Sequence, residues 1–125
     1  MLTPQALEFV TDRHVATLAT LGPDGHPHVV PIGFTFVDGI ARIITSGGNQ
    51  KVRNIERTGY ATLCQFEGAK WITLAGPATV ERDAASVAYA VELYTARYRP
   101  ARENPLRVAI RIQVERVLGS SGMRA

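Results

Sequence analysis

A stretch of alternating side chains from His28 to Val37, followed directly by Asp38-Gly39, favours folds built from antiparallel strands. The residues expected on one face of this strand are large and apolar: Val30, Ile32, Phe34 and Phe36. Those on the other face are small or flat: Val29, Pro31, Gly33 and Thr35. Because Asp-Gly between two apolar runs is a strong signal for a two-residue hairpin, residues 40–45 should return as an antiparallel strand.

Four more strands and three helices are expected along the chain. The strands are residues 15–21, 60–66, 70–82 and 107–118, the last with Val108, Ile110, Ile112 and Val114 facing inward. The first helix is expected from Thr3-Pro4 to about Arg13, with Leu7 and Val10 on one side. The second is expected over residues 50–58, after an Asn49 cap. The third is expected over residues 83–98, with Val87, Val91 and Tyr94 at helical spacing. Gly76-Pro77 indicates a bulge or an edge. This order predicts a small antiparallel barrel with helices at its rim, too narrow to enclose a sizeable ligand.

Composition narrows the class of protein. Residues 1–125 fit one domain, and 46% hydrophobic with 20% charged residues suffices for a single modest core. The chain has neither an apolar run long enough to span a membrane nor a secretory signal at its start, which predicts a soluble, cytoplasmic protein. The net charge is +3 and the basic residues are nearly all arginine, which favours an anionic ligand. Interspersed acidic residues and few aromatics argue against nucleic acid.

Two segments are candidates for ligand binding. The small face of residues 28–37 would let a planar ring lie against the backbone, although the pattern alone favours an edge strand protected by Pro31. Residues 45–51 run from a strand end through Gly47-Gly48 into a helix start, where free amides favour an anion. Further donors there come from Ser46, Gln50, Lys51 and Asn54. An ordinary turn with a solvated lysine is the competing interpretation.

Other chemistries are weakly supported. His14, His26 and His28 lack a fourth plausible metal ligand, and we expect turn and strand-end histidines rather than a metal site. No nucleophile elbow is present, and Cys64 in its apolar strand is expected to be an inert core thiol. Trp71 fits either the core or the cover of a bound ring. The cluster Arg97-Tyr98-Arg99 with Arg102 fits a solvated helix end or a patch that meets an acidic ligand tail.

Long segments of the chain resemble the pyridoxamine 5′-phosphate oxidase-like split β-barrel flavoproteins. The segments that carry the resemblance are residues 15–20, Asp24-Gly25-His26-Pro27-His28 with its continuation to Phe34, residues 42–54, Ala69-Lys70-Trp71, and residues 116–120. Within that superfamily the chain is most similar to the small deazaflavin-dependent oxidoreductases of the B class, particularly the coenzyme F-420-dependent biliverdin reductases. The resemblance implies a mainly β (α+β) fold, a six-stranded antiparallel split β-barrel with short flanking helices.

The resemblance also implies a homodimer with two cofactor sites at its interface and a small-molecule substrate. The cofactor phosphate would be held by Ser46, Gln50, Lys51 and Asn54. The ring would contact Val30, Pro31, Ile32 and Gly33, flanked by Ile44 and Thr45, with Gln65 and Trp71 in the same pocket, from either the same or the partner subunit. Reduced coenzyme F-420 would give a hydride to a conjugated substrate such as biliverdin. The propionates of biliverdin would contact Arg97, Arg99 or Arg111. No side chain is expected to act as an acid–base catalyst. Two alternatives are an FMN-dependent oxidoreductase and a non-catalytic flavin- or haem-binding protein.

Overall fold

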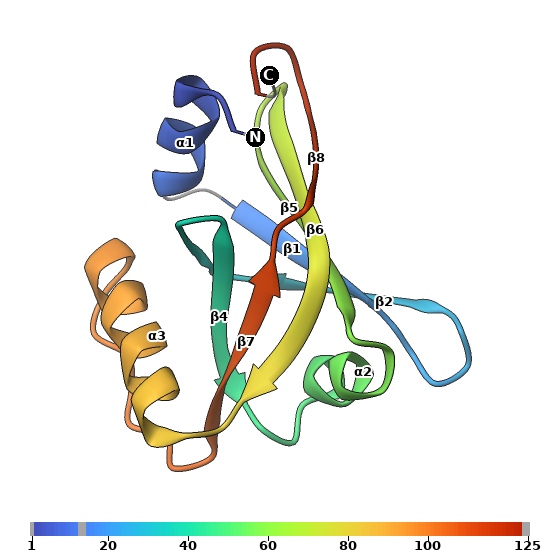
Figure 1. Ribbon diagram of the computed structural model, residues 1–125, viewed down its shortest axis with the longest axis vertical. Coiled ribbons are helices and arrows are strands. Elements are labelled where there is room, and N and C mark those ends of the chain that lie inside the picture. Colours follow the sequence, from blue (N-terminus) through green and yellow to red (C-terminus); the bar gives the residue numbers. More distant parts are fainter. Residues whose placement is uncertain (1, 13–14, 124–125) are drawn as a thin grey trace.

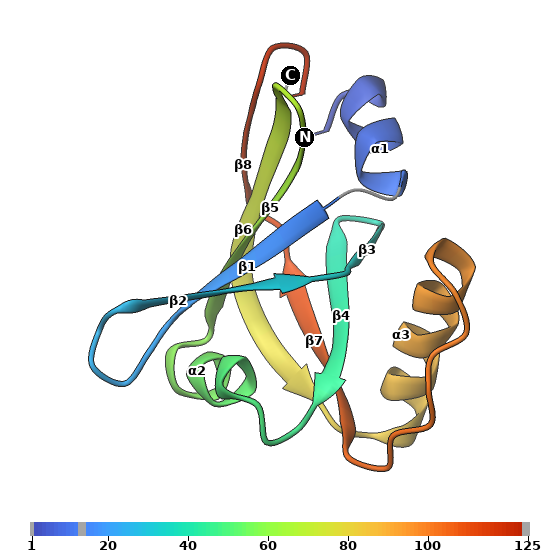
Figure 2. The ribbon, with the colours of Figure 1, turned by 180° about the vertical axis from the view of Figure 1, so that it is seen from behind.

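The computed structural model describes residues 2–12 and 15–123 (Figures 1 and 2). Its helices are α1 (Pro4–Thr11), α2 (Gln50–Thr58) and α3 (Ala84–Arg97). Its strands are β1 (Val15–Leu21), β2 (Pro27–Ile32), β3 (Thr35–Val37), β4 (Ile40–Ser46), β5 (Tyr60–Glu67), β6 (Lys70–Glu81), β7 (Arg107–Gln113) and β8 (Arg116–Gly119). The expected first helix therefore ends at Thr11, and Arg13 and His14 lie outside the described residues.

The strands form one antiparallel system in the order β2-β1-β5-β6-β7-β4-β3, with β8 paired to β6. Strand β6 is its corner, because residues 72–75 pair with β8 whereas residues 78–81 pair with β7. Gly76-Pro77 marks this change of partner rather than a bulge, since pairing with β5 continues unbroken through both residues. The expected antiparallel split barrel with flanking helices is confirmed.

Two of the six expected strands are each interrupted, giving eight. The strand expected at residues 28–37 breaks at Gly33-Phe34, where Phe34 and Thr35 are both buried and the two-residue alternation stops. The strand expected at 107–118 breaks after Gln113, where Val114 N–H donates to Gly39 O and Glu115 N–H donates to Ala75 O. In both places the backbone leaves one partner for another, and a side-chain pattern carries no signal of that exchange.

The core fills the barrel and extends beneath the helices. Val108, Ile110, Ile112 and Val114 point inward as expected. Helix α1 contributes Ala6, Phe9 and Val10, so the expectation for Leu7 is wrong: its side chain is 46% exposed. Cys64 is also not in the core, because the neighbours that turn inward along β5 are Leu63 and Gln65, which leaves the half-buried thiol on the outer face.

The helices sit around the barrel at separate places. Helix α3 runs beside β4 and β7, α2 lies near one end of the barrel, and α1 lies near the other (Figures 1 and 2). Asp83 caps α3 by accepting a hydrogen bond from Ser86 N–H. Asn49 occupies the N-cap position of α2 as expected, but its amide donates to Thr45 Oγ1 instead of capping the helix. No helix within the described ranges is long and apolar enough to cross a membrane.

Candidate functional site

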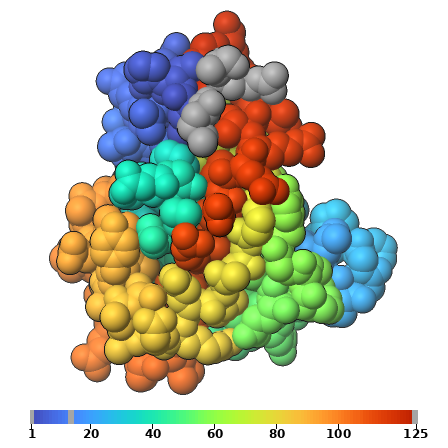
Figure 3. Space-filling model, in the orientation of Figure 1, coloured from blue at the N-terminus to red at the C-terminus, as the bar shows by residue number. Residues whose placement is uncertain are grey.

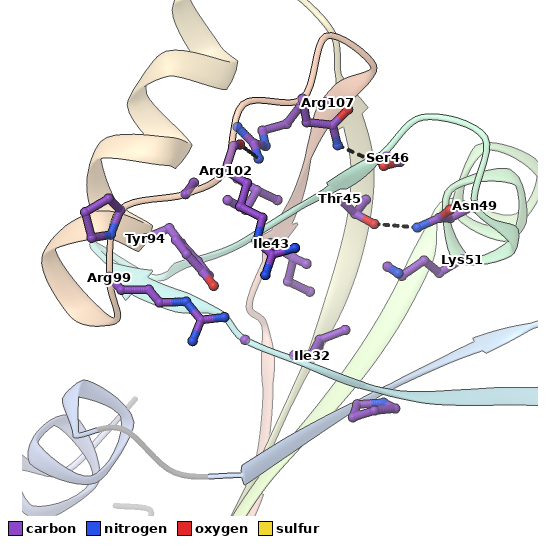
Figure 4. Close-up of a pocket in the computed structure, with 16 residues that line it drawn as sticks. Ile32, Ile43, Thr45, Ser46, Asn49, Lys51, Tyr94, Arg99, Arg102 and Arg107 are labelled. Carbon is purple, nitrogen blue, oxygen red and sulfur yellow. Dashed lines mark hydrogen bonds between the residues drawn. The ribbon is translucent and has the colours of Figure 1, made fainter.

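A pocket of about 360 Å³ opens where the β2–β3 connection, the end of β4, the start of α2 and the segment after α3 meet (Figure 4). Its floor and platform side are Pro31, Ile32, Gly33, Ile43 and Ile44. Its polar rim is Thr45, Ser46, Asn49, Lys51, Tyr94, Arg99, Arg102, Asn104 and Arg107, with Pro100 and Ala101 between them. An apolar floor beneath a rim of directed polar groups is typical of a small-molecule site.

The rim of the pocket is strongly basic. Lys51 enters from α2, and three arginines, Arg99, Arg102 and Arg107, enter from the segment after α3 (Figure 4). No aspartate or glutamate is among the described lining residues, and the ion pairs of the described residues, Asp24–His26 and Glu56–Arg82, lie elsewhere. Partial burial lowers the pKa of Lys51. An ammonium group that is partly desolvated and lacks a carboxylate is stabilised by an anion from solution.

Hydrogen bonds between segments hold together the end of the pocket next to Lys51. Asn104 Nδ2 donates to Ser46 Oγ over 2.9 Å, and Gly47 N–H donates to Leu106 O over 2.8 Å. Asn49 Nδ2 donates to Thr45 Oγ1 over 2.9 Å (Figure 4). The glycine turn after β4 is therefore tied to the loop before β7, and both present their polar groups to one side of the space beside Lys51.

Tyr98 sets the position of the platform at Gly33. Its hydroxyl accepts a hydrogen bond from Phe34 N–H and donates one to Phe34 O, each over 3.0 Å. A Cβ atom at Gly33 would lie 3.1 Å from the Tyr98 ring, so only glycine lets the backbone approach that closely without displacing the ring. Because Gly33 lines the pocket, Tyr98 is a positioning residue for the pocket's platform.

Replacing Tyr98 with phenylalanine keeps the ring against Gly33 but removes both hydrogen bonds. We expect the free energy of unfolding to fall by about 1–3 kcal/mol, because Phe34 N–H loses its partner and Phe34 O keeps only the hydrogen bond from Arg97. Urea unfolding measures this loss. Tyr89→Phe is the matched control, since no hydrogen bond joins the Tyr89 hydroxyl to another described residue; equal stability of the two variants would contradict the assignment.

Seven of the twelve residues proposed from sequence for cofactor binding line this pocket: Pro31, Ile32, Gly33, Ile44, Thr45, Ser46 and Lys51. Five do not: Val30, Gln50, Asn54, Gln65 and Trp71. Val30 is half-buried on β2 beside the lining strand segment, and Trp71 is 38% exposed on β6. Whether Trp71 reaches the pocket of a second protomer stays a prediction.

Asn54 and Gln65 lie outside this pocket in the described structure, and both are fully buried and hydrogen-bonded. Asn54 Nδ2 donates to Thr20 Oγ1, which joins α2 to β1, and its Oδ1 accepts from Gln50 Nε2 within α2. Gln65 Nε2 donates to Phe9 O and its Oε1 accepts from Arg97. The sequence shows that Asn54 and Gln65 are polar, but it does not show whether their side-chain amides face solvent or a buried partner.

Several lining residues were not anticipated, above all Tyr94, Asn104 and Arg107. The pairing of Ser46 with Arg107 brings the loop before β7 to the glycine turn, and no local pattern in the sequence signals this pairing. Among the arginines suggested for substrate contacts, Arg99 lines the pocket, whereas Arg97 is half-buried elsewhere and Arg111 lies within β7. The described residues hold no group of three or more metal-ligating side chains, and His14 lies outside them.

The chain is similar to known proteins in sequence and in fold. The family model described as pyridoxamine 5′-phosphate oxidase matches residues 2–121. An F420H(2)-dependent biliverdin reductase of Mycobacterium tuberculosis is 49% identical over 124 residues, covering 98% of this chain and 90% of that protein. The solved structure of a conserved hypothetical protein from Mycobacterium tuberculosis has a TM-score of 0.83 at 22% identity, over 95% of this chain and 84% of the other. The solved structure of an F420 reductase has a TM-score of 0.75 at 21% identity, and the match covers 89% of this chain and 94% of the other.

Proposed function

The chain belongs to the pyridoxamine 5′-phosphate oxidase family, and from this we propose that it is a coenzyme F-420-dependent reductase acting on biliverdin or a similar conjugated molecule. The observation that carries the proposal is the pocket's composition: Lys51 and three arginines without a described carboxylate, next to the flat backbone of Pro31 and Gly33. The relative at 49% identity over nearly the whole chain supports the same cofactor and substrate class.

The residues of the pocket fit a phosphorylated deazaflavin. We assign the phosphate to Ser46 and Lys51 beside the start of α2, and the ring to the platform of Pro31, Ile32 and Gly33. Arg99 and Arg102, on the other side of the pocket, suit the carboxylates of the cofactor tail or the propionates of a tetrapyrrole. When bound, reduced coenzyme F-420 supplies a hydride from a ring carbon.

The contribution of the protein is binding and orientation. The described pocket lining contains no histidine, aspartate, glutamate or cysteine, and its only other common general-acid types are Lys51, which we assign to the phosphate, and Tyr94. We therefore assign the role of proton donor to solvent. Gly33 and its neighbours would determine the face of the cofactor ring on which the substrate stacks. Because the pocket would hold the cofactor ring and the substrate in contact, their proximity would lower the barrier to hydride transfer.

A direct assay tests the proposed function. The purified protein, mixed anaerobically with reduced coenzyme F-420 and biliverdin, is expected to oxidise the cofactor and consume biliverdin in equal amounts. Reduced FMN is expected to support no comparable turnover. Turnover with FMN and none with coenzyme F-420 would contradict the proposal and favour the FMN-dependent alternative.

We also infer that the protein is a homodimer that uses the outer face of β1, β2, β5 and the first half of β6. Among the described residues, six of the nine exposed large hydrophobic side chains lie on these strands: Val15, Leu21, Val29, Tyr60, Phe66 and Trp71. Between them lie uncharged residues such as Ala19, Thr62 and Cys64, paired across β1 and β5. The β1–β2 hairpin, light blue, stands out from the body (Figure 3). Exposed apolar patches of this kind support a protein partner, and a second copy would extend the pocket to hold a whole cofactor.

Placing a charge in this face should separate the protomers. We expect Ala19→Arg to weaken dimerisation by at least about 100-fold, because an unpaired guanidinium would be buried between two apolar sheets. Analytical ultracentrifugation of dilute protein measures the change. Thr95→Arg on the exposed side of α3 serves as the control, and a dimer that survives Ala19→Arg would exclude this face.

A further inference from the structure

A second cleft lies between α1, β3 and α3 and shares no described lining residue with the pocket above. Its volume is about 280 Å³, and Figure 2 shows β3 between the two helices. Apolar side chains from all three elements form most of its wall, among them Val10, Phe36 and Leu93. Thr35 and Arg97 bring polar groups to the same wall.

Two residues that line this cleft each carry a buried polar atom with no hydrogen-bond partner among the described residues. These atoms are the hydroxyl oxygen of Thr35, a residue only 6% exposed, and Nε of Arg97. Buried polar atoms are nearly always hydrogen-bonded, to protein groups, to ordered water or to a bound ligand. Two such atoms on residues that line one cleft point to a group that accepts hydrogen bonds, since a hydroxyl can donate and a guanidinium N–H must donate.

The rest of the Arg97 guanidinium is held in place by neutral groups. One Nη donates to Phe34 O, and the other donates to Asp12 O and to Gln65 Oε1. Its central carbon stacks 4.7 Å from the centre of the Phe34 ring. Burial lowers the pKa of Arg97, an effect that the nearby Tyr98 and Asp12 side chains partly offset. The cation is thus fixed, partly desolvated and not ion-paired with a described carboxylate.

We propose that this cleft binds a small apolar carboxylate. One carboxylate oxygen would accept hydrogen bonds from Arg97 Nε and the Thr35 hydroxyl, and the apolar body would lie against Val10, Phe36 and Leu93. The volume suits a single aromatic ring or a short aliphatic chain, and is too small for a tetrapyrrole or a flavin. The proposal stands independently of the cofactor assigned to the other pocket.

Fluorine NMR with 4-(trifluoromethyl)benzoate as the probe tests this site. The wild-type protein should bind the probe saturably, and 4-(trifluoromethyl)benzyl alcohol, which lacks the charge, should bind at least about tenfold more weakly. Thr35→Val should weaken benzoate binding by about tenfold or more. Because the Thr35 hydroxyl has no partner to lose, this variant should keep or raise the thermal stability of the protein.

A second variant fills the cleft instead of removing a donor. Ala96→Trp, at a lining position on α3, should abolish probe binding, whereas Ala85→Trp, exposed on the same helix outside the cleft, should leave it unchanged. The assignment would be overturned by no saturable binding, by equal affinity for acid and alcohol, or by binding that survives Thr35→Val or Ala96→Trp. A clear loss of stability in Thr35→Val would also overturn it, because that hydroxyl would then have a structural partner.

Discussion

Gly76→Ala is expected to destabilise the protein by more than about 3 kcal/mol or to prevent folding. At the corner of β6, a Cβ on Gly76 would lie 1.9 Å from Gln113 O and 2.9 Å from the carbonyl carbon of the same residue. Both atoms belong to the backbone that connects β7 to β8, so no side-chain rotation relieves the overlap. Relief would require the two strands to separate at the point where β6 changes partner.

Urea unfolding followed by circular dichroism measures this change, with the soluble yield as the readout if the variant does not fold. Gly48→Ala is the matched control: nothing lies within 4 Å of the place its new methyl group would take, and the φ of Gly48 is not positive. We expect that substitution to change the free energy of unfolding by less than about 1 kcal/mol. If Gly76→Ala were as stable as Gly48→Ala, the corner geometry described for β6 would be wrong.

Lys51→Met is expected to weaken cofactor binding by about 10- to 100-fold while leaving the fold intact. The substitution removes the one ammonium group among the described lining residues of the pocket but retains a side chain of similar length. A charge-assisted contact to a phosphate accounts for a loss of this size. Fluorescence titration with coenzyme F-420 measures it, and Lys51→Arg should recover part of the affinity because it restores the charge.

Lys70→Met is the control, because Lys70 is the chain's other lysine and lies at the start of β6, outside this pocket. A pH series adds an independent check. Burial lowers the pKa of Lys51, and only the protonated amine attracts phosphate. Affinity should therefore be complete below that lowered pKa and fall as the pH rises through it, earlier than for an ordinary lysine, and this fall should be absent in Lys51→Met. An unchanged profile would remove Lys51 from the phosphate site.

Much of the fold was predictable because its signals are local. Asp38-Gly39 marks the β3–β4 hairpin, and the inward positions of Val108, Ile110 and Ile112 follow directly from alternation. The breaks at Gly33-Phe34 and after Gln113 were not predictable, since they depend on distant partners, the hydroxyl of Tyr98 and the carbonyl of Ala75. The sequence shows which residues can form a strand, but not where the backbone of that strand hydrogen-bonds to a different segment.

The candidate site likewise combines residues that local sequence patterns predict with residues that they do not predict. Pro31, Gly33, Ser46 and Lys51 belong to two local patterns, and the structure brings them to one pocket. Asn104 and Arg107 reach that pocket only through the pairing of β4 with β7, which no local pattern contains. Conversely, Gln65 is polar in sequence but buried beside Arg97, where it supports the barrel instead of lining the pocket.

The selection of a phosphorylated deazaflavin by the pocket beside Lys51 is the core of the proposed function. Its most direct test is to titrate the purified protein with coenzyme F-420, with FMN, and with the deazaflavin nucleoside that lacks phosphate, following cofactor fluorescence. We predict the tightest binding for coenzyme F-420, weaker binding for FMN, and a loss of at least about tenfold for the phosphate-free compound. Preference for FMN, or affinity that does not depend on the phosphate, would contradict the account.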